Sequence, residues 1–378
     1  MSDRAGSAGP RSTAEGGAEL IEVARELARD LPQYRAAHDR DRQLAPAVIG
    51  ALRERGILGA LAPNLLGGAE LRPSDYVQVL EALARGDSAT AWVVMTATTT
   101  ALLGAYLPRA TADRLWASGT PLFAGIFAPT GKLTDGKLTG RWSYASGSRH
   151  AEYVALGALS DKRHVMCFVP AASLKTVDDW DTLGLGGTGS HALVATDVRV
   201  AADHVCSVFA DAPWPKTPLY RLPLFGVLAS GVTACALGIA GGALDHAGKK
   251  LAGEPDNNKD TPSAQLAKFA ELHARFAAAR AYLLATCDAA YAAAEREAID
   301  GAVRAEMRLA ASHVATECAE VVRGAFRLGG GASIRATSPL NAALRDIETV
   351  LTHKMIVDRL LPTIGRALLG IGDVPPDL

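Results

Sequence analysis

Apolar residues recur at helical spacing in the first third of the chain and again in its last part, whereas the middle of the chain has strand-like runs. Residues 21–27 and 48–56 show the three-and-four spacing of amphipathic helices. Residues 153–156 and 164–169 are short β-rich runs between Gly, Pro and Asp. The pattern predicts a disordered tail over 1–17, a helical domain over 18–120, a β domain over 121–215 and a helical bundle over 216–378.

The runs of the middle region follow one another too closely for crossover helices. The strands are therefore predicted to pair antiparallel, as in a small barrel or sandwich.

Two apolar stripes in the last region predict a close-packed antiparallel bundle. One stripe consists of Leu266, Phe269, Phe276, Leu283 and Cys287, and the other of Met307, Ala311, Val314, Cys318, Val321 and Ala325. Helices that are apolar on more than one side favour burial between subunits, so we expect a homo-oligomer. A large internal core would produce the same pattern.

Composition disfavours several classes of partner. The 378 residues include 39 Lys and Arg against 40 Asp and Glu, which leaves no basic excess for nucleic acid or an anionic membrane. The first 17 residues lack the apolar core of a signal peptide and the length of a membrane span. The five cysteines form no CxxC pair, so the sequence predicts neither a metal site nor a disulfide framework and favours a cytoplasmic location.

Two local patterns resemble known motifs without their context. Residues 184–189 read GxGxxG, but no hydrophobic strand precedes them and a strand-like run follows, which disfavours a dinucleotide-binding turn. Asp245 and His246 are neighbours on a predicted helix and point about 100° apart, which disfavours a hydrolytic triad.

Residues 140–151 form an aromatic and hydroxyl-rich turn between two strand-like runs. A planar tricyclic ring needs a flat apolar wall and a few polar groups aimed at its edge. Trp142 and Tyr144 could supply that wall, and Ser146 could supply a hydroxyl. The turn is therefore either a flavin-facing segment or an ordinary connection between strands.

Several stretches share their order and spacing with a known family, namely residues 42–46, 63–68, 86–92, 127–129, 140–150, 180–190 and 328–346. In these stretches the chain resembles the acyl-CoA dehydrogenase fold, and more particularly its flavin-dependent monooxygenase branch. The resemblance implies a mainly α protein with an N-terminal helical domain, a central antiparallel β barrel or sandwich and a C-terminal four-helix bundle. It also implies a homotetramer.

The resemblance further implies where reduced flavin, as FMN or FAD, would bind. Ser146 would form a hydrogen bond with the flavin N5 atom, and Thr188 and Ser190 would approach the ring or its ribityl-phosphate arm. Further contacts would come from Phe127, Trp142, Tyr144 and Gly147. Alternatively, Thr188 and Ser190 stabilise a turn through bonds to the backbone.

One position separates the dehydrogenases of this fold from the monooxygenases. Many acyl-CoA dehydrogenases carry a catalytic Glu eight residues beyond the residue that matches Asp346, and this chain has Lys354 there, which cannot act as a carboxylate base. His353 stands where the monooxygenase branch carries a histidine. It would stabilise or protonate the C4a-hydroperoxide that reduced flavin forms with dioxygen. A histidine satisfied within its helix is the structural alternative.

Candidate substrate-pocket residues are Trp92, Thr100 and His150. Phenol hydroxylases of this branch often carry a histidine shortly after the Ala-Trp pair, whereas this chain has three threonines at 98–100. A heteroaromatic or amine substrate is therefore favoured over a phenol.

The sequence thus predicts a two-component monooxygenase of specialised metabolism or aromatic catabolism. It would take reduced flavin from a separate reductase and use dioxygen to hydroxylate a small organic molecule. The absence of a dinucleotide-binding fingerprint agrees with a separate reductase. The alternatives are an FAD-dependent dehydrogenase or oxidase and a non-catalytic oligomeric binding protein.

Overall fold

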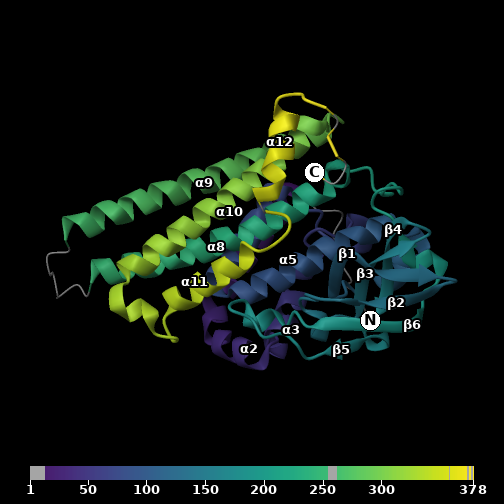
Figure 1. Ribbon diagram of the computed structural model, residues 1–378, viewed down its shortest axis with the longest axis horizontal. Helices are drawn as coiled ribbons and strands as arrows, with labels where there is room; N and C mark the ends of the chain where they lie inside the picture. Colours follow the sequence, from purple (N-terminus) through teal and green to yellow (C-terminus); the bar gives the residue numbers. More distant parts are fainter. Residues whose placement is uncertain (1–12, 254–261, 357, 373, 376–377) are drawn as a thin grey trace, which may run out of the picture.

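A helical layer, a β-sheet and a helical bundle follow one another along the chain in the computed structural model (Figure 1). The structure describes residues 13–253, 262–356, 358–372, 374–375 and 378. The first helix begins at Thr13, so the tail predicted over 1–17 is wrong from that residue onward. The rest of the predicted tail lies outside the described residues.

Between residues 13 and 115 the structure has six α-helices, namely α1 (Thr13–Asp30), α2 (Arg35–Asp41), α3 (Pro46–Glu54), α4 (Pro73–Gly86), α5 (Ser88–Leu102) and α6 (Arg109–Leu115). Proline occupies the first position of α3 and α4, where its missing N–H costs no hydrogen bond. Asp87 caps α5 by accepting a bond from Thr90 N at 3.1 Å. Helix α5 lies between the bundle and the sheet (Figure 1), and all of its residues but Thr96 are buried.

Seven strands form one sheet, namely β1 (Phe123–Thr134), β2 (Lys137–Trp142), β3 (Tyr153–Ser160), β4 (Arg163–Pro170), β5 (Lys175–Val177), β6 (Ala192–Arg199) and β7 (Val205–Cys206). Their order is β5-β6-β2-β1-β3-β4-β7. The prediction of antiparallel pairing is wrong for β1 and β3, which are parallel. Residues 143–152 carry the chain from β2 to the other side of β1 without an α-helix, so the short spacing did not exclude a crossover.

The C-terminal part contains α7 (Pro218–Arg221), α8 (Leu224–Ala252), α9 (Ser263–Glu295), α10 (Gly301–Leu328), α11 (Pro339–Val350) and α12 (Leu361–Leu368). Helix α8 is the central helix, and Gly238 permits its close contact with α4, since a Cβ there would lie 2.4 Å from the Glu81 carbonyl oxygen. Helix α8 has a mean hydropathy of 1.9 over 18 residues, high enough for a membrane span. However, 94% of that window is buried inside the protein, as in the core helix of a soluble protein.

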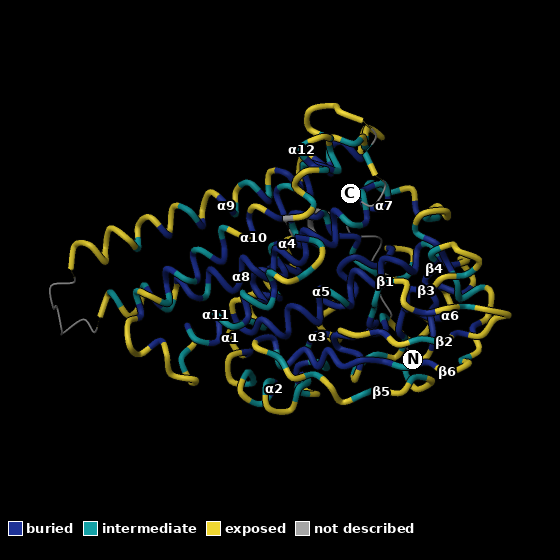
Figure 2. The backbone as a smooth tube through the Cα atoms, viewed as in Figure 1, coloured by how far each residue is buried: buried dark blue, intermediate teal, exposed yellow. Residues whose placement is uncertain are grey.

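The predicted stripe on α10 is confirmed, because all six of its residues are buried. The stripe on α9 is wrong at its start, where Leu266 is 50% exposed, whereas Phe276, Leu283 and Cys287 are buried. The first turns of α9 extend beyond the neighbouring helices, and the outer face of α9 is exposed (Figure 2). The mainly α fold with a central sheet is confirmed.

Candidate active site

Trp92 on α5 joins two segments that lie far apart in the sequence. Its indole Nε1 donates to Ser146 Oγ at 3.2 Å, in the turn after β2. Its ring also meets the His353 imidazole edge to face, with 5.4 Å between the centroids, in the turn after α11. Three of the predicted site residues are therefore brought together where the helical layer, the sheet and the bundle meet.

A chain of buried hydroxyls continues from Ser146. Ser146 Oγ lies 2.7 Å from Ser190 Oγ, which lies 2.7 Å from Thr188 Oγ1. Thr188 Oγ1 lies 2.8 Å from the Leu185 carbonyl oxygen, which can only accept, so the Thr188 proton points there. Ser190 must then donate to Thr188, and Ser146 must donate to Ser190. Because Trp92 donates to Ser146, only a lone pair of Ser146 remains free, and Ser146 can offer a ligand only an acceptor.

The turn that carries Ser146 is held against the turn that carries Thr188. Gly147 N donates to the Thr188 carbonyl at 2.9 Å. Gly147 has φ of +71°, and a Cβ there would lie 2.8 Å from Val93 Cγ1. Only glycine combines this backbone conformation with the close approach of α5.

Asp346 on α11 fixes the far end of the hydroxyl chain. It is 3% exposed, and its Oδ1 accepts from Leu185 N at 2.8 Å. Its Oδ2 accepts from Ser88 Oγ and from the Arg35 guanidinium. Leu185 is held at φ of +56°, which is unfavourable for a branched residue, and its carbonyl is the one that Thr188 binds. Asp346 thus positions the hydroxyl chain through one residue, Leu185.

A buried histidine and aspartate pair lies beside the same turns. His38 Nδ1 lies 2.9 Å from Asp87 Oδ2, and each side chain is 1% exposed. Burial alone would raise the pKa of Asp87, but the hydrogen bonds from His38 and Thr90 hold it below its ordinary value. A Cβ on Gly187 would lie 2.6 Å from His38 Cβ, so the pair is packed against the turn.

Three buried polar atoms near these turns have no partner among the described residues, namely His38 Nε2, Ser148 Oγ and His191 Nε2. Buried polar atoms are almost always hydrogen-bonded in native proteins. Unpaired polar atoms on or beside the turns that carry Ser146 and Thr188 fit a polar ligand such as a flavin. The residues present therefore suit that cofactor.

His353 is set up as a neutral donor. Met355 N donates to its Nδ1 at 3.4 Å, which leaves the ring proton on Nε2. Burial, followed by the positive charges of Arg308 and Lys354, lowers the pKa of His353 to about 4. The imidazole is therefore uncharged at neutral pH.

This lowered pKa makes the folded protein sensitive to acid. The pKa of an unfolded histidine is about 6.5, so between roughly pH 6.5 and 4 the unfolded chain binds a proton that the folded protein does not. The free energy of unfolding should fall as pH decreases through this window, with His353 contributing at most about 3 kcal/mol. His353→Gln should flatten the pH dependence of urea unfolding there. An unchanged slope would contradict the assigned environment.

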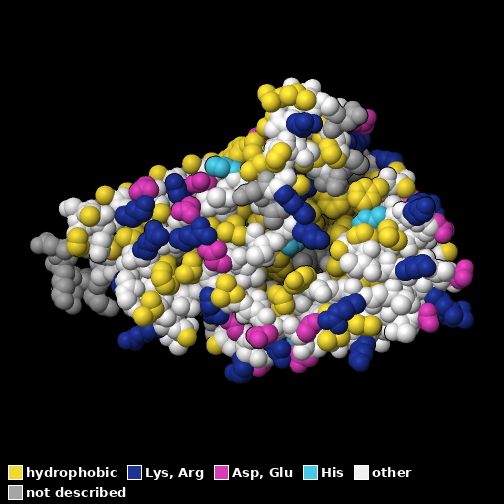
Figure 3. Space-filling model, in the orientation of Figure 1, with side chains coloured by type: hydrophobic (Ala, Val, Ile, Leu, Met, Phe, Trp, Pro, Cys, Tyr) yellow, Lys and Arg dark blue, Asp and Glu magenta, His cyan; other side chains and the backbone are white. Residues whose placement is uncertain are grey.

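An aromatic cluster lies where the sheet meets the start of α8. Phe127 on β1 contacts Phe225 at 5.9 Å between ring centroids, and Phe225 contacts Phe209 at 5.8 Å. The irregularity in pairing between Ile126 and Gly131 places Phe127 on a bulge of β1. The surface is hollowed between α12 and the sheet, and hydrophobic and histidine side chains gather there (Figure 3).

Comparison with known proteins matches both helical parts of the chain to one family. Residues 16–111 match the acyl-CoA dehydrogenase N-terminal domain, and residues 230–358 match the acyl-CoA dehydrogenase C-terminal domain. An indole-3-acetate monooxygenase from Acinetobacter baumannii is 30% identical over 92% of this chain and 94% of its own length. The chain belongs to the acyl-CoA dehydrogenase family. Within that family it is a flavin-dependent monooxygenase.

Further relatives agree with this assignment. The oxygenase component of an FADH2-dependent resorcinol hydroxylase from a Rhizobium species is 28% identical over 87% of this chain and 89% of its own length. The structure of XiaF from a Streptomyces species, in complex with FADH2 and glycerol, superposes with a TM-score of 0.89. It is 23% identical and covers 97% of this chain and 98% of that one, which shows a common fold.

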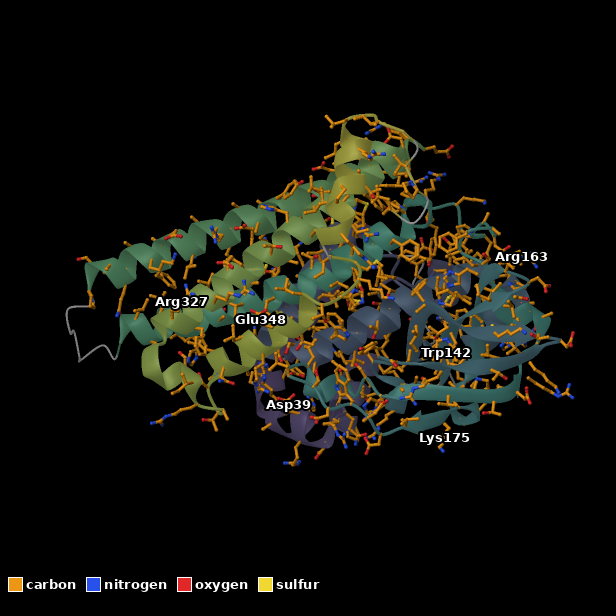
Figure 4. All side chains as sticks on the ribbon, viewed as in Figure 1. Asp39, Trp142, Arg163, Lys175, Arg327 and Glu348 are labelled. Atoms are coloured by element: carbon orange, nitrogen blue, oxygen red, sulfur yellow. The ribbon has the colours of Figure 1, made fainter. Side chains whose placement is uncertain are left out.

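The predicted aromatic wall of the monooxygenase is wrong at Trp142. Trp142 is 1% exposed and donates to the Gly157 carbonyl at 2.7 Å, inside the core of the sheet (Figure 4). Its ring fills the space that the missing side chains of Gly131 and Gly140 leave open. Tyr144, two residues later, is 73% exposed and contacts Trp180 edge to face. The two rings therefore cannot line one surface.

Two predicted pocket residues of the monooxygenase are engaged elsewhere. Thr100 is 1% exposed, donates to the Thr96 carbonyl at 2.7 Å and packs against Gly125 of β1, so its assignment to the pocket is wrong. His150 Nε2 accepts from Leu44 N at 3.2 Å.

The structure favours the turn-stabilising alternative for Thr188 and Ser190, because the chain that ends at Leu185 uses both of their protons. Their hydroxyls thus orient the Ser146 hydroxyl through the hydrogen-bonded chain.

Sequence reasoning missed Asp346 and the pair of His38 with Asp87. Asp87 had a local signal, since an Asp before a helical run is a typical cap. His38 and Arg35 had none, because their partners lie far away along the chain. Asp346 entered only as the residue from which the position of Lys354 is counted.

Proposed function

We propose that the protein is the oxygenase component of a two-component system that hydroxylates a small aromatic or heteroaromatic molecule with reduced flavin and dioxygen. The meeting of His353, Trp92 and the acceptor-only Ser146 carries this proposal. Bound reduced flavin supplies two electrons to dioxygen, so that one oxygen atom enters the substrate and the other leaves as water.

A separate reductase supplies the reduced flavin in this proposal. The glycine-rich segment 184–189 forms part of a turn at the site and is followed by β6, so it is not the start of a dinucleotide-binding helix. Relatives such as the resorcinol hydroxylase are named as oxygenase components. If reduced flavin diffuses freely between the two proteins, a reductase that makes no physical contact with the oxygenase should still support turnover when it is added in excess.

Ser146 would accept a hydrogen bond from N5–H of reduced flavin. Oxidised flavin has no proton on N5, so the same contact would place two acceptors together, which is unfavourable. Reduced flavin should therefore bind about tenfold or more tightly than oxidised flavin. Anaerobic titration of both redox states measures the ratio.

The variant Ser146→Ala should reduce that ratio severalfold by weakening the binding of reduced flavin. Ser143→Ala, on the exposed part of the same turn, is the matched control and should leave the ratio unchanged. Equal affinities for the two redox states in the wild-type protein would contradict the orientation of the hydroxyl chain.

The neutral His353 would donate a hydrogen bond from Nε2 where flavin and dioxygen would meet, and it would carry no additional proton to transfer at neutral pH. A carboxylate base for thioester dehydrogenation is not supported here, since the charges acting on His353 are those of Arg308 and Lys354. Lys354 is itself exposed.

The aromatic cluster favours a planar substrate, because Phe127, Phe209 and Phe225 offer ring faces and edges at the sheet–bundle boundary. A phenol that must be deprotonated is disfavoured. Thr98, Thr99 and Thr100 all donate their protons to backbone carbonyls of their own helix, so none can act as a base. The indole-3-acetate monooxygenase relative suggests an indole-like ring.

A panel of an indole carboxylate, a phenol and a primary amine tests the substrate class. The proposal predicts hydroxylated product from the first of these at a specificity constant about tenfold or more above the other two. Preference for the amine would contradict the aromatic assignment.

A cytoplasmic homotetramer acting in specialised metabolism, with FMN or FAD as cofactor, remains a proposal. Exposed apolar side chains such as Ile334 and Leu369 provide surface for association. Light scattering of the purified protein measures the number of subunits.

A further inference from the structure

Arg308 is a cation buried in the interior of the protein, on α10. It is 1% exposed, and a buried charge is costly unless several groups bind it. Its Nη2 donates to the Met355 carbonyl at 3.2 Å, and its Nη1 donates to a main-chain oxygen of Leu378 at 3.4 Å. The guanidinium therefore connects α10 to the segment that follows α11.

Met355 links Arg308 to His353. Its carbonyl accepts from Arg308, and its N–H donates to His353 Nδ1 at 3.4 Å. The turn is closed further by His353 N, which donates to the Val350 carbonyl at 3.0 Å, and by Ile356 N, which donates to the His353 carbonyl at 3.1 Å. A guanidinium bond on one side of the Met355 residue thus stabilises the imidazole bond on the other.

The charges around the imidazole act in the same direction. Arg308 faces it from α10, Lys354 belongs to its own turn, and α5 presents the neutral indole of Trp92. Both cations disfavour protonation of the ring, because protonation would give it a positive charge. Arg308 is the buried one of the two, so solvent screens it less.

We propose that Arg308 is a positioning residue that holds His353 in one orientation as a neutral Nε2–H donor, through the Met355 backbone and through its own charge. The role of this donor in hydroxylation rests on the proposed function. The tautomer and the pKa of His353, however, are properties of the protein without flavin. Arg308 itself touches neither substrate nor cofactor in this proposal.

Nuclear magnetic resonance of ¹⁵N-histidine-labelled, flavin-free protein tests the proposal, with His353→Gln used to assign the signal among the nine histidines. The ring nitrogen shifts report the tautomer, and their pH dependence reports the pKa. The wild-type protein should show the Nε2–H tautomer and a pKa of about 4. Arg308→Met should raise the pKa of His353 by about one pH unit or more, and both neutral tautomers of its ring should then be populated.

Two further variants separate the bond from the charge. Arg308→Gln retains a donor for the Met355 carbonyl but no charge, so it should raise the pKa and keep the tautomer. Arg308→Lys retains the charge and should keep the low pKa. Lys354→Met, which removes an exposed charge outside the bond network, should raise the pKa less than Arg308→Met and leave the tautomer unchanged.

Unchanged pKa and tautomer in folded Arg308→Met would overturn the proposal. If that variant does not fold, an unchanged pKa in Arg308→Gln overturns it equally. Because these measurements need no flavin, they are independent of hydroxylation. Failure of the wild-type protein to hydroxylate any substrate would defeat the proposed function while leaving the role of Arg308 intact.

Discussion

Replacement of His353 by Ala is expected to separate oxygen consumption from hydroxylation. The imidazole lies edge to face with Trp92, whose indole donates to the acceptor-only Ser146. Loss of one preorganised hydrogen-bond donor typically costs about 10²–10³-fold in rate, so product per reduced flavin should fall about 10²-fold or more. Hydrogen peroxide should accumulate instead. Parallel assays of product and peroxide, with reduced flavin supplied chemically, measure this coupling.

His273→Gln is the matched control, because His273 is exposed on α9, far along the chain from the site. It should retain wild-type coupling. Binding of reduced flavin should change less than about threefold in His353→Ala, since Ser146 and the turns remain. Wild-type coupling in His353→Ala would show that the imidazole is not the hydrogen-bond donor on which hydroxylation depends.

Asp346→Ala is expected to have the largest effect on stability. The carboxylate binds Arg35, Ser88 and Leu185 N at once, and it is nearly fully buried. Removing one partner of a buried ion pair leaves an uncompensated charge and costs about 3–5 kcal/mol. The free energy of urea unfolding should fall by that amount. Leu185 would also relax from its left-handed conformation and release the hydroxyl chain, so coupling should fall in any variant that still folds.

Two comparison variants test this reasoning. Ser88→Ala removes one bond to the same carboxylate and should cost about 1 kcal/mol. Arg109→Gln breaks an exposed pair with Asp113 within α6 and should cost about 0.5 kcal/mol or less. A loss in Asp346→Ala no greater than that in Arg109→Gln would contradict the central role of Asp346.

The helices and most strands could be predicted because their signal is local. The α10 stripe from Met307 to Ala325 is buried on the face that its spacing indicates. Trp142 shows how a local signal was overlooked. Along β2, Leu138 and Trp142 lie on one face, and both are buried. The two-residue period of the strand therefore already indicated a core position for this indole.

The tertiary contacts of the site could not be predicted in the same way. Leu185 depends on Asp346, and Asp346 depends on Arg35, and these residues come from three different parts of the fold. No period or spacing joins them, since such contacts form only when the sheet and the bundle pack together. The resemblance to a family indicated Trp92, Ser146 and His353. It did not indicate the direction of the hydroxyl chain behind Ser146.

The parallel pairing of β1 with β3 could not be predicted for the same reason. Residues 143–152 are long enough either to turn back or to cross over, and the sequence does not distinguish these outcomes. The crossover brings this segment, including Ser146 and Gly147, against α5. The topology that was predicted wrongly is thus the one that builds the site.

Incorporation of oxygen from ¹⁸O₂ tests the central claim most directly. The wild-type protein, given reduced flavin and an indole carboxylate, should yield a product that carries one ¹⁸O atom, with the second atom released as water. Mass spectrometry of the product reads the result. Product without ¹⁸O, or turnover that proceeds without dioxygen when an electron acceptor is added, would contradict the assignment of this protein as a monooxygenase.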